Sequence, residues 1–315
     1  MYLSKVKNIE VQGLVDVCAF GHITKESEVF RGVFRTFTAG PPYFFSIALK
    51  RLGSNVKVVT KIAANDLDII SELIDLGINV IVRESKYTSS FHTEYGKSLD
   101  ERYIEVLSVA DPFTIDDLKY CSEGKYIYIG PLTTKDFNIE FLMEARKYAP
   151  LILDVQGFTR KVVNNRIEYV DWSWKHEGIR YVDIFKADIK EANILTSTSN
   201  PIEALDKLLE WGPKEVMITS NNGVYLGVKG VGKFFSPFKV KEVKGRVGRG
   251  DTCIASYIHA RLKGMDYARS LIFATAATSL KLSYQGPLRN SEGEVLAYIR
   301  DYYSDVDPKH IPSSR

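Results

Sequence analysis

The sequence predicts an α/β fold of three layers, in which a largely parallel sheet lies between two layers of helices. Short apolar runs, such as Leu14 to Phe20, Val56 to Ile62 and Tyr126 to Ile129, alternate with stretches of helical periodicity. The 315 residues, of which 45% are hydrophobic and 26% charged, suit one large globular unit. We therefore expect one Rossmann-like domain over residues 1–315, with a small appendage.

The overall composition argues against several classes of function. The net charge of +3 is small and no basic tract occurs, so binding to nucleic acid is not expected. The sequence has no long apolar span and no recognisable signal peptide, which predicts a cytoplasmic protein without membrane contact. Cys18, Cys121 and Cys253 are odd in number and scattered. We expect them to be reduced, mostly buried thiols and not a zinc site.

The first predicted strand opens into a loop at its carboxyl end, where ligands gather in parallel sheets. His22 and Glu26 follow that strand, and either could meet a substrate, although a structural role is favoured for His22. The segment Ala39-Gly40-Pro41-Pro42 then ends the extended structure, and a helix follows that carries Phe44 and ends at Gly53.

Two segments, about 24–38 and 80–108, interrupt the strand–helix alternation. Val29 to Thr38 alternates loosely, and the second segment contains short strands with polar alternation and a turn at Gly96 and Asp100. Such an insertion indicates a small β-strand lid, or a clasp through which a homodimer forms. An ordinary surface hairpin fits the same pattern.

Polar residues follow a further buried strand, Leu151 to Leu153. Asp154 and Gln156 end that strand, and Arg160 is close behind. An acid, an amide and a guanidinium at the carboxyl end of a strand predict a site for a polar substrate or for a metal with its waters. The alternative is turn chemistry by Asp154 and Gly157.

Three later segments have two interpretations each. Asp188 and Glu191 begin a helix after the strand Asp183 to Ala187, where they could form a capping box, hold magnesium through water, or both. The polar turn Thr219 to Gly223 is suited to phosphate or ribose. The small-residue helix face Ala274 to Thr278 admits either a packed helix or a flat ring.

The most informative segment is Gly248-Arg249-Gly250-Asp251-Thr252, between an extended stretch (Phe234 to Val243) and a helical pattern. Glycines let a ligand approach the backbone, and the first N–H groups of a helix favour an anion. The turn therefore predicts a phosphate or oxyanion site, with Asp251 as the base for a bound hydroxyl. A turn followed by an aspartate N-cap fits the same letters. A Walker loop does not, because no Gly-Lys-Ser/Thr follows.

The order of these parts resembles the ribokinase/PfkB carbohydrate kinase family over nearly the whole chain. In that family a Gly-Ala-Gly-Asp turn forms the anion hole and supplies the base, and it matches Gly248 to Asp251. The Asn-x-x-Glu magnesium motif matches Asp188 with Glu191, and the Thr-Leu-Gly nucleotide turn loosely matches Thr219 to Gly223. The family's Gly-Gly motif matches Ala39-Gly40, and its Asp-x-Asn-x-x-x-Arg-like stretch matches Asp154 to Arg160.

Departures from the family pattern narrow the resemblance. Phe44 stands at the sugar-binding asparagine, Glu26 stands near the early substrate aspartate, and Arg249 replaces a small residue. These changes argue against the acceptor contacts of ribokinase or fructokinase. Four segments together look like the bacterial and archaeal myo-inositol kinase branch: Asp154 to Arg160, Phe185 to Ala192, Gly245 to Cys253, and Gly286 to Arg289.

The resemblance implies a ribokinase-type fold and transfer of the ATP γ-phosphate, with Mg²⁺, to a hydroxyl of a small polyol or sugar, myo-inositol first. It implies catalytic roles for Gly248, Arg249, Gly250 and Asp251. Acceptor binding falls to Glu26, Gly40, Phe44, Gln156, Arg160 and Asp251. Nucleotide binding falls to Asp188, Thr219, Ser220, Asn222, Gly223, Gly248, Gly250 and Ala277. Metal binding falls to Asp154, Asp188 and Glu191.

Two other classes of function stay open. One is a kinase of the same family for another sugar or for a nucleoside. The other is a catalytically silent regulator that binds a sugar or nucleotide. The presence of Asp251 and Glu191 argues against the silent regulator.

Overall fold

The computed structural model describes residues 14–309 and 311, apart from residues 31, 97–101 and 122. Its larger sheet runs, from one edge to the other, β15 (Gly232–Pro237), β14 (Gly223–Val228), β13 (Glu215–Thr219), β12 (Ile184–Asp188), β9 (Leu151–Asp154), β8 (Tyr126–Gly130), β1 (Val17–Gly21), β4 (Val56–Ile62) and β5 (Asn79–Glu84). All neighbours from β5 to β13 are parallel, whereas β14 and β15 are antiparallel. The carboxyl ends of seven strands therefore share one edge.

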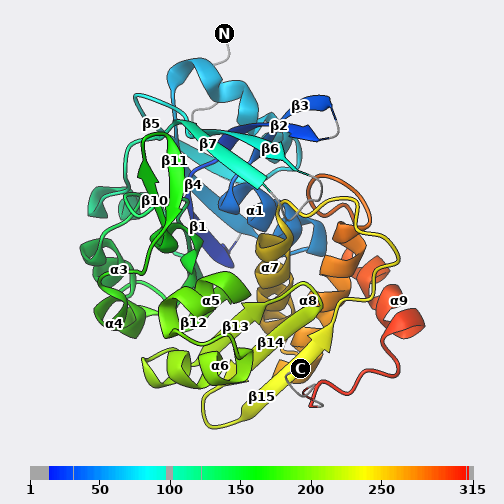
Figure 1. Ribbon diagram of the computed structural model, residues 1–315. Coiled ribbons are helices and arrows are strands. Elements are labelled where there is room, and N and C mark those ends of the chain that lie inside the picture. The colour runs from blue at the N-terminus through cyan, green and yellow to red at the C-terminus, as the bar shows by residue number, and fades with distance from the viewer. Residues whose placement is uncertain (1–13, 31, 97–101, 122, 310, 312–315) are drawn as a thin grey trace.

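Helices cover both faces of this sheet, as Figure 1 shows. On one face lie α1 (Pro41–Leu52), α2 (Ser71–Asp75), α7 (Arg249–Leu262), α8 (Tyr267–Leu282) and α9 (Glu292–Tyr302). On the other lie α3 (Ile139–Ala145), α4 (Lys175–Gly178), α5 (Ile189–Thr196) and α6 (Pro201–Glu210). Short 3-10 segments connect the elements: η1 (Ala64–Ile70), η2 (Ile115–Tyr120), η3 (Val155–Thr159) and η4 (Ile179–Tyr181).

The strands read as continuous apolar runs because each buries both of its faces. In β1, Val17 and Ala19 belong to the core beneath α1 and α7, while Cys18 and Phe20 belong to the core beneath α3. This arrangement confirms the predicted α/β/α layers. The expected helix begins at Pro41, with Pro42 in its first turn, and its predicted end at Gly53 is confirmed, with Gly53 in the left-handed conformation at the C-cap.

A smaller sheet stands over the carboxyl edge of the larger one (Figure 1). Its order is β10 (Arg160–Val163), β11 (Arg166–Tyr169), β7 (Arg102–Ser108), β6 (Ser90–Tyr95), β2 (Thr24–Phe30) and β3 (Val33–Ala39). Three separate chain segments thus build it. The predicted turn at Gly96 and Asp100 falls largely outside the described residues.

The composition of the smaller sheet differs from the sequence-based expectation in two ways. Strand β5 pairs with β4 in the larger sheet, although the expected lid segment began at about residue 80. The hairpin β10–β11 was not predicted at all. Its signal was the Asn164-Asn165 pair, which adopts positive φ angles of 47° and 61° as a tight hairpin turn requires.

Two further expectations are corrected. From the sequence, Leu67 to Leu76 is expected to be one helix closed by Gly77. The structure has instead a 3-10 segment followed by a short helix, with non-helical dihedral angles at Asp66. Cys18 and Cys121 are not free thiols, because they form a buried disulfide across a sequence separation of 103 residues. The expectation of a reduced, buried thiol is correct for Cys253. None of the described helices combines the length and apolar character needed to cross a bilayer.

Candidate active site

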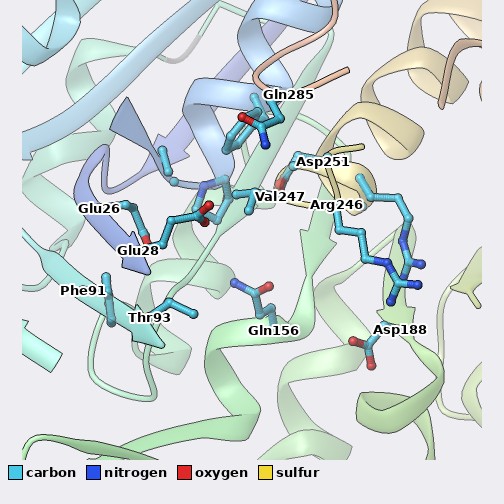
Figure 2. A pocket seen from close by; sticks show the side chains of 18 of the residues that line it. Glu26, Glu28, Phe91, Thr93, Gln156, Asp188, Arg246, Val247, Asp251 and Gln285 are labelled. Carbon is cyan, nitrogen blue, oxygen red and sulfur yellow. The ribbon is translucent and has the colours of Figure 1, made fainter. Parts of the chain in front are cut away.

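A cavity of about 1060 Å³ lies between the smaller sheet and the carboxyl edge of the larger one. Figure 2 shows Glu26 and Glu28 on one side of it and Arg246 and Asp188 on the other, with Asp251 between them. Many predicted site residues line this cavity: Glu26, Gly40, Phe44, Asp154, Gln156, Arg160, Asp188, Thr219, Gly248, Arg249, Gly250 and Asp251. The remaining ones, Glu191, Ser220, Asn222, Gly223 and Ala277, are not part of its lining.

The glycine turn forms the start of α7 at the floor of the cavity. Gly248 is the N-cap, with φ 78° and ψ 10°, and its carbonyl accepts a hydrogen bond from the Thr252 N–H. A side chain at Gly248 would also collide with the Phe44 ring, 2.3 Å from the position of its Cβ. The interpretation of Asp251 as the N-cap is therefore wrong. Asp251 lies in the first helical turn, where N–H groups lack partners within the helix.

The Asp251 carboxyl group has an environment that suits a base working near neutral pH. Burial, and secondarily the nearby Asp154 carboxylate, raise its pKa to about 7. The Lys186 ammonium and the Tyr128 hydroxyl act in the opposite direction, and the Tyr128 Oη donates to Asp251 Oδ1 at 3.3 Å. The Tyr128 ring is fixed by stacking on Phe45, with ring centroids 3.8 Å apart.

Lys186 is a site residue that the sequence reasoning missed. It lies in β12, is buried, and its Nζ is 2.8 Å from Asp154 Oδ2. Burial alone would lower its pKa, but the carboxylates of Asp154, Glu191 and Asp251 raise that pKa above its usual value, so the side chain is charged. The available signal was a lysine inside an otherwise apolar strand, one residue before Ala187-Asp188.

One side of the cavity, called the acceptor side because the sequence led us to expect acceptor binding there, combines polar groups from the smaller sheet with Gln156 and Arg160. Glu28 is buried and accepts a hydrogen bond from Arg35 Nε, while Thr24 Oγ1 donates to Glu26 Oε1 at 3.0 Å. The buried Nε of Arg160 has no hydrogen-bond partner among the described residues. Figure 2 shows Gln156 pointing into the cavity.

Glu28 and Arg35 were not predicted as site residues. Their signal was the period of two in the first lid strand, which places Glu28 on the same face as Glu26. Apolar side chains complete this wall, among them Phe37, Phe91, Leu132 and Ile167. The acceptor side is therefore an apolar surface with a few charged and amide groups, which is typical of sites for small polar molecules.

The opposite side of the cavity is suited to an anion. Arg246, Arg249 and Lys186 line it together with Asn221, whose Oδ1 accepts from Arg249 Nη1 at 3.1 Å. The Ser220 hydroxyl is engaged within its own turn, where it accepts from the N–H groups of Asn222 and Gly223 at 3.2 Å. Ala277 is fully buried in α8, so its small-residue face packs in the core.

The capping box of α5 is confirmed. The Asp188 Oδ1 accepts from the Glu191 N–H at 2.8 Å, and the Glu191 Oε2 accepts from the Asp188 N–H at 2.7 Å. Burial and the neighbouring Asp188 raise the pKa of Glu191 to about 8. Among the described residues, no group of three or more His, Cys, Asp or Glu side chains is arranged to hold a metal on its own.

His22 has the structural role that the sequence favoured. It is buried, its Nε2 is 3.0 Å from the Asp111 carbonyl oxygen, and its Nδ1 is 3.3 Å from Asp136 Oδ2. The imidazole also stacks on Phe113, with ring centroids 4.8 Å apart. It is absent from the cavity lining.

Comparison with known proteins identifies the family. The model of the pfkB family carbohydrate kinases matches residues 25–292. The chain belongs to the PfkB family of carbohydrate kinases. This kinase therefore acts as a phosphotransferase on a hydroxyl of a sugar or polyol. Curated proteins yield no significant match to it.

Solved structures extend the similarity over nearly the whole chain. A pyrophosphate-dependent kinase of the ribokinase family, complexed with a pyrophosphate analog and myo-inositol, is 31% identical over 89% of this kinase and 99% of its own chain, with a TM-score of 0.82. A sulfate complex of a pyrophosphate-dependent kinase in the ribokinase family is 33% identical over 90% and 100%, with a TM-score of 0.84. Ribokinase from Arabidopsis thaliana, at 17% identity over 91% and 99% and a TM-score of 0.75, shares the fold.

Proposed function

We propose that this kinase phosphorylates a hydroxyl of myo-inositol and that its phosphoryl donor is inorganic pyrophosphate. The observation that carries the proposal is the cavity itself: Asp251 and the first turn of α7 separate a hydroxyl-binding side from an arginine-rich anion-binding side. The acceptor and donor are supported by the solved kinase with bound pyrophosphate analog and myo-inositol, which is 31% identical to this chain.

The residues of the acceptor side suit a cyclic polyol. A carboxylate (Glu26), an amide (Gln156) and a guanidinium (Arg160) stand beside apolar side chains that can cover the face of a ring. Phe44 occupies the position at which ribokinase-like sequences carry a sugar-binding asparagine, and it is buried beneath Gly248. An acceptor that lacks the expected hydroxyl groups leaves buried polar groups unpaired, so discrimination between acceptors should be strong.

The reaction then follows from the geometry at α7. Asp251 accepts the proton of the acceptor hydroxyl while that oxygen forms a bond to the terminal phosphorus of the donor. The bond from that phosphorus to its bridging oxygen breaks, and orthophosphate leaves. The N–H groups of Gly250 and Asp251, together with the Lys186 ammonium, stabilise charge on the transferring group.

The donor assignment replaces the ATP that the family resemblance implied. Arg246 and Arg249 provide two guanidinium groups for phosphate oxygens, whereas four of the residues expected to bind a nucleotide (Ser220, Asn222, Gly223 and Ala277) lie outside the cavity lining. Pyrophosphate needs only the anion-binding side. ATP would need a further surface for its adenosine moiety, and it is the alternative donor.

Magnesium suits this site in combination with a donor. Asp188 lines the cavity on the same side as Arg246, and one or two carboxylates plus phosphate oxygens are the usual protein environment of Mg²⁺. Of the other expected ligands, Asp154 is paired with Lys186 and Glu191 is engaged in the capping box. When bound, the ion would neutralise the donor phosphates. Asp188 would hold it through water.

Initial rates with each donor and each acceptor test the proposal. Pyrophosphate and ATP are compared, with Mg²⁺, against myo-inositol, ribose, fructose and adenosine, and the phosphate ester is quantified by mass spectrometry. We expect the highest kcat/KM for pyrophosphate with myo-inositol. A tenfold preference for ATP would overturn the donor, and a tenfold preference for another acceptor would overturn inositol. No ester with any pair would favour the silent regulator.

A further inference from the structure

Lys281 is a buried lysine next to the active site that the mechanism above does not use. It lies in the last turn of α8, is fully buried, and has no ion-pair partner among the described residues. Its Nζ donates to the Gly245 carbonyl oxygen at 2.9 Å. A buried ammonium held by a neutral carbonyl is costly, and a buried titratable group beside a cavity is a candidate for a functional role.

The contact of Lys281 falls on the segment that leads into the anion-binding turn. Residues 244–248 form the last part of the connection from β15 to α7, and all of them, including the N-cap Gly248, line the cavity. The Lys244 N–H donates to the Leu282 carbonyl oxygen at 2.8 Å, so the backbone of this segment is tied to the end of α8 next to the lysine contact.

Within this segment, Gly245 packs tightly against the chain that follows α8. A Cβ at Gly245 would be 2.4 Å from the Tyr284 carbonyl oxygen. The next residue, Gln285, accepts a hydrogen bond from Arg35 of β3. The chain that follows α8 therefore contacts both the segment 244–248 and the edge strand of the smaller sheet. Figure 2 shows Gln285 and Val247 on the same side of the cavity as Asp251.

We propose that Lys281 is a positioning residue for phosphoryl transfer, whose ammonium holds residues 244–248 against α8 and thereby fixes the anion-binding turn. The helix end supports this role, because the C-terminal turn of a helix favours a positive charge. Burial lowers the pKa of Lys281 to about 7, and the Asp251 carboxylate counteracts that effect. An anionic donor at the turn adds to the effect of Asp251.

The inference rests on the phosphotransferase activity, and it is tested with Lys281→Met and Lys281→Ala. We expect Lys281→Met to lower kcat/KM for pyrophosphate by roughly tenfold or more, with the KM for myo-inositol little changed. Ammonium chloride should restore part of the activity of Lys281→Ala, because ammonium can replace the missing group. Tetramethylammonium chloride at equal ionic strength should not, and the parent enzyme should respond to neither.

Lys207→Met is the control for the loss of a lysine that contacts a backbone carbonyl. Lys207 Nζ also donates to a backbone carbonyl, that of Thr196 at 3.0 Å, but α6 does not contribute to the cavity. The Lys207→Met variant should leave the KM values for pyrophosphate and for myo-inositol unchanged. The added Cβ of Gly245→Ala would collide with the Tyr284 backbone and shift the same segment, so this variant should reproduce the weakened use of pyrophosphate even where a Lys281 variant does not fold.

Donor kinetics of Lys281→Met and Gly245→Ala that equal those of the parent would overturn the proposal, as would an equal response of Lys281→Ala to both salts. A parent enzyme that turns over neither pyrophosphate nor ATP is a separate result, because it contradicts the proposed function before any variant is compared.

Discussion

The Lys186 ammonium lies 2.8 Å from the Asp154 carboxylate, and this buried pair joins β12 to β9 directly beneath the anion-binding turn. A Cβ placed on Gly250 would be 2.6 Å from Lys186 Nζ. The turn can therefore approach the ammonium closely only because it carries no side chain at that position. Removing one member of such a buried pair leaves an uncompensated charge, which typically costs about 3–5 kcal/mol.

Gly250→Ala should reduce activity without unfolding the protein. The added methyl group displaces the Lys186 ammonium from the turn, whereas alanine in a helix is favoured over glycine by about 1 kcal/mol. We expect kcat/KM to fall by roughly tenfold or more while the melting temperature changes little. Steady-state kinetics and thermal unfolding measure the two effects.

Gly293→Ala is the control for that variant. Gly293 is the second residue of α9, as Gly250 is of α7, and nothing lies within 4 Å of its added Cβ. It should be fully active. Parent-like kinetics for Gly250→Ala would argue against close approach of a phosphate to this turn.

Asp251→Asn should abolish most of the turnover and preserve the fold. Asparagine keeps the size of the side chain but cannot take a proton, and a general base typically contributes about 10²–10⁴-fold. Binding of pyrophosphate, measured by calorimetry, should be largely retained. Asp206→Asn, which removes a surface ion pair with Lys233, is the control and should have full activity. If Asp251→Asn had close to full turnover, Asp251 would not be the general base and its role would be structural.

The pH profile should report the same carboxyl group. The pKa of Asp251 is raised to about 7, and the ionised form is the base, so kcat/KM should rise with pH up to about that value. On the acidic side the rate should fall about tenfold per pH unit. In Asp251→Asn this inflection should be lost. A parent profile that is flat between pH 5 and 8 would contradict the raised pKa.

Local patterns in the sequence predicted those features that depend on neighbouring residues. The strand–helix alternation gave the three layers, and the spacing of Asp188 and Glu191 gave the capping box. The Gly-x-Gly-Asp pattern located the start of the helix. It did not identify Gly248 as the N-cap, because the φ angle of that residue cannot be predicted from the sequence pattern. The expectation of myo-inositol as the acceptor came from resemblance to a family, and not from periodicity or spacing.

Contacts between distant residues were beyond such reasoning. Lys186 and Asp154 are 32 residues apart and meet only because their strands are neighbours in the sheet. Lys281 and Gly245 meet because the end of α8 returns to the segment before α7. Glu28 faces the cavity only once three chain segments have assembled into the smaller sheet.

The magnesium requirement should distinguish Asp188 from Glu191. Asp188 lines the cavity, so Asp188→Asn should raise the magnesium concentration for half-maximal rate severalfold. Asparagine still accepts a hydrogen bond, so the cap of α5 should persist. Glu191→Gln keeps the acceptor oxygen for the Asp188 N–H and should change the magnesium titration less. The reverse order would assign the metal to Glu191.

The Cys18–Cys121 disulfide should stabilise this kinase without contributing to catalysis. It closes a loop with a sequence separation of 103 residues, and neither cysteine lines the cavity. A disulfide typically stabilises a protein by about 2–4 kcal/mol, and longer loops give more. Incubation with a reductant should therefore lower the melting temperature of the parent by several degrees, with the initial rate at moderate temperature unchanged.

The Cys253→Ala variant should respond to the reductant as the parent does, since Cys253 is not part of a disulfide. In contrast, the double variant Cys18→Ala/Cys121→Ala should melt at one temperature with or without reductant. A parent enzyme whose melting temperature is indifferent to the reductant, while mass spectrometry finds both thiols free beforehand, would contradict the disulfide.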